Sequence, residues 1–298
     1  MNGTFLQTRK FLNYHPEGRF VDASFFVEKS GIVVAVVPGC SVDGSFISHL
    51  GSTFGGPVIS KDFYSGSKIL EIVKDIDDYI ARNFKNVKLK PTSPIFATVP
   101  TDLLDYALEH SGFTRHTELS CYTPIAKDVD PLENCKRECR HNFRQSEKLN
   151  LTYGEIPDSE MEKFYDLLVM SKARYNTKPV HTLAELQDLK QRFPEEILFR
   201  GVWQDGVYLS GMMIFYFRQA KVFHFQYLAP DDSKRETNAT TSLFVNAMRE
   251  AAQAGCEKFS WGISTEDAGA YLNENLYRFK ESFGALPCVN ARYEKSCS

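Results

Sequence analysis

The stretch ILFRGVWQDGVYLSGMMIFYFRQAKVFHFQYL, residues 197–228, decides the fold that this sequence predicts. Its apolar residues fall into three runs, at 197–203, 207–217 and 222–228, and all three are rich in β-branched and aromatic side chains. Asp205 and Gly206 separate the first two runs, and an Asp-Gly pair is a strong signal for a tight β-hairpin turn. We therefore predict a meander of three antiparallel strands.

Helical patterns flank this meander on both sides. Before it, Ser159 with Glu162 and Thr182 with Glu185 have the spacing of capping boxes, which begin helices. After it, a helical apolar face ends at Gly255, a residue typical of the position that follows a helix. The order predicted for residues 151–298 is therefore β-α-α-β-β-β-α-β-α-β, with the later elements at 258–261 (strand), 272–283 (helix) and 289–293 (strand).

The first half of the chain repeats most of this order, without the opening strand and helix. We predict a mixed-sheet α/β fold made of two copies of one unit, the first copy degenerate. The predicted domains are residues 1–130, a basic inter-domain helix at 131–150, and residues 151–298. The elements predicted for the first copy are strands at 20–27, 32–37, 45–50, 95–99 and 119–124 and helices at 69–80 and 103–108.

Composition limits the function classes. The 298 residues are 43% hydrophobic and carry a formal net charge of −3, so the strongly basic domain expected of a duplex-DNA binder is missing. No secretory signal pattern and no apolar run of about 20 residues is present, so we expect a cytoplasmic protein without an integral membrane segment. The seven cysteines are an odd number, and we expect reduced, mostly buried thiols.

The predicted order resembles that of the GNAT acyltransferases, and two such units in tandem are similar to the FemAB-like family. Its sharpest local match is LYRFKESFG at 276–284, which resembles the family's Phe-Lys-x-x-Phe-Gly segment. The stretches WGISTE (261–266), NYHP (13–16) and SHLGSTFGG (48–56) are similar to its acyltransferase branch. The resemblance implies a transferase that moves an acyl or aminoacyl group onto an amine in bacterial cell-envelope or polysaccharide assembly.

GNAT proteins bind the coenzyme A pyrophosphate with the pattern Arg/Gln-x-x-Gly-x-Gly/Ala, and RETNAT at 235–240 is similar to it. Glycine lets the backbone approach the phosphates, and the amides of a helix N-terminus attract anions. Asn238 stands where glycine would be, and asparagine adopts positive φ more readily than most residues. The resemblance implies acyl-coenzyme A, with acetyl-coenzyme A as first choice; the alternative is a capped loop without a ligand. The predicted donor-binding residues are Arg235, Asn238, Ala239, Thr240 and Thr241.

Three residues are predicted to be catalytic. The resemblance places the family's catalytic lysine at Lys280, where an ammonium could stabilise an oxyanion. His224 and Glu266 are the candidate bases, since the attacking amine must lose a proton. The structural alternatives are a helix C-terminal cation for Lys280, a core histidine for His224 and a loop or cap carboxylate for Glu266.

The acceptor and a metal are the remaining ligands to consider. We assign acceptor contacts to Lys172, Arg174, Tyr175, Trp261 and Asn273, the alternative for 172–178 being a solvated basic turn. We predict no metal site, because Cys135, Cys139 and His141 do not have the spacing of zinc ligands.

Three functions follow as hypotheses. The first is an N-acyltransferase acting by direct attack, which moves an acyl group from acyl-coenzyme A to an amine of a small or sugar- or envelope-linked acceptor. The second is a FemAB-type aminoacyl-tRNA-dependent transferase in peptidoglycan precursor assembly, for which the basic residues of 136–148 could contact tRNA. The third is a non-catalytic ligand-binding module of the same fold. A monomer or a homodimer is expected in each case.

Overall fold

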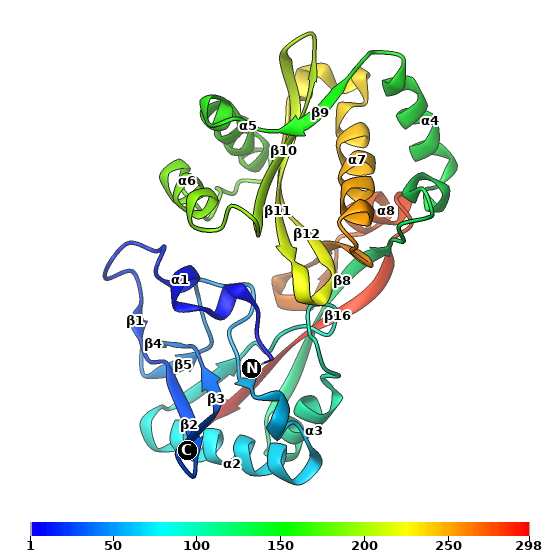
Figure 1. Ribbon diagram of the computed structural model, residues 1–298. Coiled ribbons are helices and arrows are strands. Elements are labelled where there is room, and N and C mark those ends of the chain that lie inside the picture. Colours follow the sequence, from blue (N-terminus) through cyan, green and yellow to red (C-terminus); the bar gives the residue numbers. More distant parts are fainter. Residues whose placement is uncertain (1, 298) are drawn as a thin grey trace. The chain divides into compact units, whose positions relative to one another are not determined.

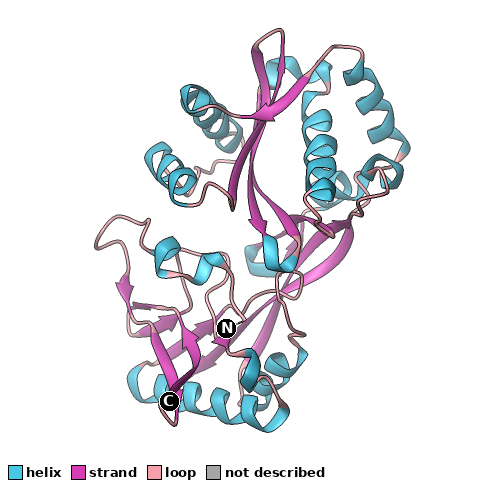
Figure 2. Cartoon of the chain, viewed as in Figure 1, coloured by secondary structure: helices cyan, strands magenta, loops and turns pink. Residues whose placement is uncertain are grey.

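The computed structural model describes residues 2–297 and divides into two compact units (Figures 1 and 2). Unit 1 contains residues 2–119, 267–271 and 289–297, and unit 2 contains residues 120–266 and 272–288. The chain passes from one unit to the other within the long strands β8 (Thr114–Pro124) and β16 (Leu286–Ser296), and also on either side of residues 267–271. This division differs from the expected domains, because residues 120–150 join unit 2 and the last residues return to unit 1.

Up to its last helix, unit 2 has the element order that the sequence predicts, whereas the last predicted strand forms β16 and lies mostly in unit 1. The sheet of unit 2 runs β8-β13-β12-β11-β10-β9; the β12–β13 pair is parallel and the other neighbouring pairs are antiparallel. The predicted turn holds Asp205 and Gly206 at positive φ, and the Thr182–Glu185 capping box forms at the start of α6. The elements are β9 (Thr152–Glu155), α5 (Met161–Ala173), α6 (Leu183–Arg192), β10 (Ile197–Gln204), β11 (Val207–Phe217), β12 (Val222–Pro230), α7 (Ala239–Gln253), β13 (Lys258–Ile263), β14 (Thr265–Glu266) and α8 (Glu274–Ser282).

Helices cover both faces of this sheet. Helices α5 and α6 lie on one face, and α7 lies on the other (Figure 1). The basic segment forms α4 (Arg137–Glu147), which packs on α7 within unit 2 rather than between domains. An aromatic core that includes Phe244, Trp261 and Phe283 fills the space beneath α7 and α8.

Unit 1 holds a separate three-stranded sheet, the strands β1-β4-β5-β7-β16 of an 11-stranded sheet, and the predicted helices. The predicted hairpin forms as β2 and β3, and β2-β3-β6 is one sheet. The expected strand at 95–99 is wrong: the strand after α2 is β7, and residues 93–96 form a turn, which contains Pro94 and is closed by a hydrogen bond from the Phe96 amide to the Ser93 carbonyl. Ile95 and Phe96 are buried without entering a sheet. The elements are α1 (Arg9–Leu12), β1 (Val21–Asp22), β2 (Phe25–Lys29), β3 (Ile32–Val37), β4 (Cys40–Val42), β5 (Ser45–Ile47), β6 (Val58–Ile59), α2 (Gly66–Asn83), β7 (Asn86–Leu89) and α3 (Asp102–His110), and β15 (Tyr271–Leu272) lies at the later boundary between the units.

The helices and the cysteines of the described residues test two expectations, on membrane spans and on thiols. Between residues 2 and 297, no helix has the length and apolar composition needed to cross a bilayer. All seven cysteines are free thiols and five of them are buried, as predicted.

Candidate functional site

The candidate site in unit 2 begins where the parallel strands β12 and β13 stop pairing. Their last residue pair is His224 with Ser260, although β12 continues to Pro230 and β13 continues to Ile263. Just beyond this pair, Gln226 has no partner in β11, which is the register shift of a β-bulge. The end of β12 therefore has backbone groups that make no hydrogen bonds to β13.

The N-terminus of α7 follows the same strand. Asn238 has φ 54°, so it adopts the left-handed conformation that the sequence predicts for the glycine-like position. The Thr237 hydroxyl accepts a hydrogen bond from the Ala239 amide at 3.3 Å, and the Thr240 hydroxyl lies 3.2 Å from the Ser210 hydroxyl. Thr240 and Thr241 lie in the first turn of α7, where backbone amides have no acceptor within their own helix. Two adjacent amides at the positive end of a 15-residue helix can bind an anion.

Ion pairs or hydrogen bonds engage the two carboxylates of this loop. Asp232 pairs with Arg174 of the α5 C-terminus and with Arg235, whose Nε lies 2.9 Å away. Asp231 accepts hydrogen bonds from the amide and the hydroxyl of Ser233. The predicted donor residue Arg235 and the predicted acceptor residue Arg174 are therefore brought together on one carboxylate.

Lys280 is buried, with 2% of its surface exposed, and all three of its N–H donors are used. Its Nζ donates to the carbonyl oxygens of Gly262 (3.0 Å) and Ile263 (2.6 Å) and to the Ser264 hydroxyl (2.9 Å). Burial lowers the pKa of this ammonium to about 8. In this arrangement Lys280 holds the end of β13, and it would have to release one acceptor before it could donate to an oxyanion.

The two candidate bases lie in different surroundings. His224 is buried, its Nδ1 lies 3.0 Å from the Ser260 hydroxyl, and burial lowers its pKa to about 4. Glu266 is exposed and accepts a hydrogen bond of 2.6 Å from the Asn273 side chain. Asn273 in turn caps α8 by accepting from the Leu276 amide at 2.9 Å. Of the two candidate bases, only His224 lies at the point on β12 where β12 stops pairing with β13.

The other predicted acceptor residues are spread over unit 2. Trp261 is buried in the core, and its indole donates to the Thr123 hydroxyl at 2.9 Å. Lys172 lies over the Tyr227 ring, and burial lowers the pKa of its ammonium. Tyr175, with 73% of its surface exposed, follows the end of α5. Lys172 and Arg174 therefore lie near β12 and its following loop, whereas Trp261 packs beneath α7.

Sequence reasoning missed a buried pair on the α5 side of β12. The Tyr227 hydroxyl lies 2.7 Å from Nδ1 of His181, a residue of the loop before α6. Burial raises the pKa of Tyr227 to about 12, and hydrogen bonds to the Gln226 side chain and to the backbone at residues 180 and 181 oppose this shift. A hydrogen bond to the Gln226 side chain also opposes the lowering of the His224 pKa. No local motif predicts the pair, because its members are 46 residues apart.

No metal cluster is found in the described part of the chain, since no group of three or more His, Cys, Asp or Glu side chains is placed to hold an ion. Cys135 and Cys139 are both buried and interact through a hydrogen bond between their thiols. His141 lies on the exposed side of α4.

These features define a fold of two GNAT-like units, and solved structures share it. FemX superimposes with a TM-score of 0.74 at 12% identity over 99% of this chain and 92% of its own. L-PGS from Bacillus licheniformis gives a TM-score of 0.59 at 12% identity, covering 98% of this chain and 93% of its own. A tandem GNAT protein from the clavulanic acid biosynthesis pathway gives a TM-score of 0.55 at 9% identity, covering 97% of this chain and 86% of its own.

The chain therefore has the FemAB-like, tandem GNAT fold that the sequence predicts. At these identities the likeness concerns the fold. No model of a protein family matches the sequence, and no curated protein matches it.

Proposed function

We propose that this chain is an N-acyltransferase that moves an acyl group from acyl-coenzyme A to an amine of a small or sugar- or envelope-linked acceptor. The observation that carries the proposal is the end of β12–β13 pairing at His224 and Ser260, on the strand whose following loop leads to the N-terminal amides of α7. The unpaired part of β12 suits an extended ligand, and the amides of Thr240 and Thr241 suit its phosphates. Bound acyl-coenzyme A would supply a thioester carbonyl for attack and a thiolate leaving group.

Residues of unit 2 carry out the proton transfers of this reaction and hold the site in place. The amine nitrogen bonds to the acyl carbon, the carbon–sulfur bond breaks, and the amine must lose a proton. His224, kept neutral at pH 7 by its low pKa, takes up this proton. Tyr227, kept protonated by its high pKa, can donate one to the leaving sulfur. Lys280 acts as a positioning residue that holds the end of β13.

Ligand binding tests the donor. Acetyl-coenzyme A at 100 times its Kd should stabilise the protein by about 2.7 kcal/mol in thermal unfolding, with free coenzyme A as a second ligand. Thr241→Asp places a carboxylate at the anion site and should remove the shift, although an acid in the first turn of a helix is itself mildly stabilising. Gln253→Glu adds the same charge at the other end of α7 and is the matched control. A shift that persists in Thr241→Asp would refute the assigned site.

Turnover tests the transfer itself. Release of free thiol from acetyl-coenzyme A should require an added amine, and Tyr227→Phe should lower kcat by about 10²–10⁴ if Tyr227 is the acid. If acetyl-coenzyme A binds but no added amine leads to thiol release, the chain is a ligand-binding module and the proposed transfer is wrong.

One observation favours an aminoacyl-tRNA donor as a second candidate. Arg137, His141, Arg144 and Lys148 form one row along the exposed face of α4, and none of these four forms an ion pair within the described residues. Cationic rows of this kind bind phosphate backbones in a salt-dependent way. Arg137→Glu with Arg144→Glu should abolish transfer from aminoacyl-tRNA and leave transfer from acyl-coenzyme A unchanged.

A further inference from the structure

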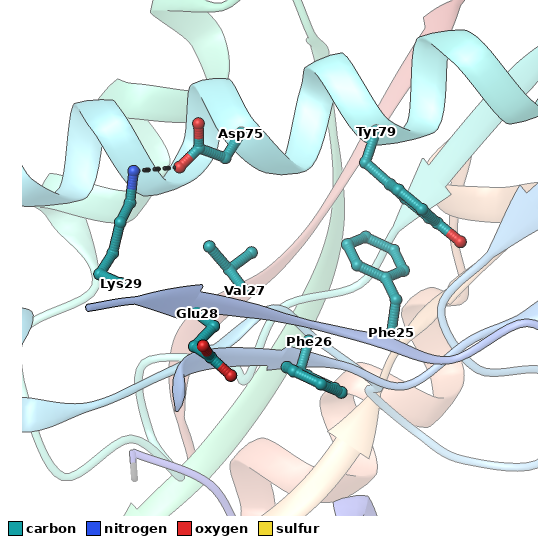
Figure 3. A pocket seen from close by; sticks show the side chains of 7 residues that line it. All are labelled: Phe25, Phe26, Val27, Glu28, Lys29, Asp75 and Tyr79. Atoms are coloured by element: carbon teal, nitrogen blue, oxygen red, sulfur yellow. Dashed lines mark ion pairs between the residues drawn. The ribbon is translucent and has the colours of Figure 1, made fainter. Parts of the chain in front are cut away.

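A hollow on unit 1 runs along the edge of strand β2 (Figure 3). Its volume is about 370 Å³, and its lining consists of the five consecutive residues Phe25–Lys29 together with Asp75 and Tyr79 of α2. Successive side chains of a strand point to opposite faces of the sheet. A hollow that touches all five residues must therefore follow the strand's edge, where the backbone is reached directly.

This edge of β2 carries no partner strand. The sheet order is β2-β3-β6, and within the described residues the backbone of Phe25–Lys29 hydrogen-bonds to β3 alone. An unpaired strand edge is a template for a further strand from another chain. Phe26 is 59% exposed beside it, so this edge also presents an apolar side chain.

Charge and aromatic rings define the side chain that the hollow fits. Lys29 pairs with both Glu71 (2.6 Å) and Asp75 (2.5 Å), so two carboxylates share this single ammonium, and Glu28 lines the same hollow from the other face of β2 (Figure 3). At the other end, the Phe25 and Tyr79 rings lie 4.2 Å apart between centroids, and Figure 3 shows them facing each other. Carboxylates beside aromatic rings favour a cationic side chain.

We propose that the β2 edge binds an extended basic segment of a partner protein, which adds as a strand to β2 and places a lysine or arginine between Asp75 and Tyr79. This inference is independent of the proposed transferase function, because every residue involved belongs to unit 1 and none is assigned to the transferase site. Main-chain hydrogen bonds to β2 give affinity, and the hollow gives the preference for basic side chains.

Fluorescence polarisation with labelled, capped peptides tests the proposal on the full chain. Val-Lys-Val-Lys-Val-Lys should bind with a Kd below about 1 mM, and its affinity should fall as salt rises. Val-Glu-Val-Glu-Val-Glu should not bind, and methylation of alternate backbone nitrogens in the lysine peptide should abolish binding. These two peptides separate the charge preference from strand addition.

Variants of the hollow test where the peptide binds. Asp75→Asn with Glu28→Gln should weaken the lysine peptide about fivefold or more, the ratio that about 1 kcal/mol produces. Asp166→Asn removes an exposed carboxylate of α5 in unit 2 and should leave the affinity unchanged. The proposal is overturned if the lysine peptide fails to bind, if the methylated peptide binds equally well, or if the two variants weaken binding to the same extent.

Discussion

Replacing Lys280 by methionine separates a positioning role from a direct role in catalysis. Methionine keeps a long, unbranched side chain in the same space but removes the ammonium, so Gly262, Ile263 and Ser264 lose their shared donor. Each hydrogen bond from a charged donor contributes about 1.5–3 kcal/mol, so the three together give roughly 4.5–9 kcal/mol before the cost of burial.

The burial cost of the ammonium offsets part of this stabilisation. Its pKa falls from 10.5 to about 8, which corresponds to about 3 kcal/mol at roughly 1.4 kcal/mol per unit. The same substitution removes that cost, and methionine adds apolar burial. We therefore expect Lys280→Met to lower the free energy of unfolding of unit 2 by about 3 kcal/mol, within a range of roughly 1–6 kcal/mol.

Urea unfolding and native-state hydrogen exchange measure this effect. The amides of β13 and α8 should lose protection in Lys280→Met, whereas Lys163→Met, at an exposed lysine of α5, should stay within about 0.5 kcal/mol of the parent. An unchanged unfolding free energy, combined with a loss of turnover of about 10²–10³, would refute the positioning role and favour an oxyanion donor.

Four further predictions concern caps and titrating groups. Because Asn238 has positive φ, Asn238→Gly should leave the free energy of unfolding in urea unchanged or raise it, whereas Asn238→Val should lower it by about 1–2 kcal/mol. The same free energy of unfolding in both variants would contradict this prediction. Burial lowers the pKa values of His49 and His224 to about 4, so as the pH falls these histidines are protonated in the unfolded chain before they are protonated in the folded one. The free energy of unfolding should therefore be at its full value above pH 6.5 and fall toward pH 4, by at most about 1.4 kcal/mol per pH unit for each histidine. Urea unfolding measured across this pH range checks the prediction, and a free energy of unfolding that does not change with pH would refute it. Asn273→Ala should cost about 1 kcal/mol through loss of the α8 cap. Glu266→Gln should leave kcat nearly unchanged if Glu266 supports that cap, and a fall of 10²-fold or more in kcat would instead identify a base.

Local sequence signals predicted the elements whose geometry is set by neighbours in the chain. The Asp205-Gly206 turn, the capping box at Thr182 and the positive φ of Asn238 each depend on a few adjacent residues. The strand expected at 95–99 failed for a related reason. Ile95 and Phe96 are buried by tertiary packing, so their apolar character did not indicate a strand.

Long-range contacts explain what the sequence could not show. The Ser159–Glu162 spacing fits a capping box, yet no side chain caps the start of α5. Tyr227 meets His181 because α5 and the loop before α6 pack against β12, and no spacing in the chain predicts that meeting. The C-terminal strand looked like the last element of the second copy, but most of β16 belongs to unit 1, where Tyr293 pairs with Leu89.

The position of Lys280 follows from the same break in the sheet that suggests a donor site. Once β12 and β13 stop pairing at Ser260, the carbonyl groups of Gly262 and Ile263 lie beyond the last residue pair with β12. Buried backbone carbonyls need donors, and among side chains only lysine brings three rotatable donors on one atom without an acceptor. In this chain α8 supplies the donors for these two carbonyls, through the ammonium of Lys280.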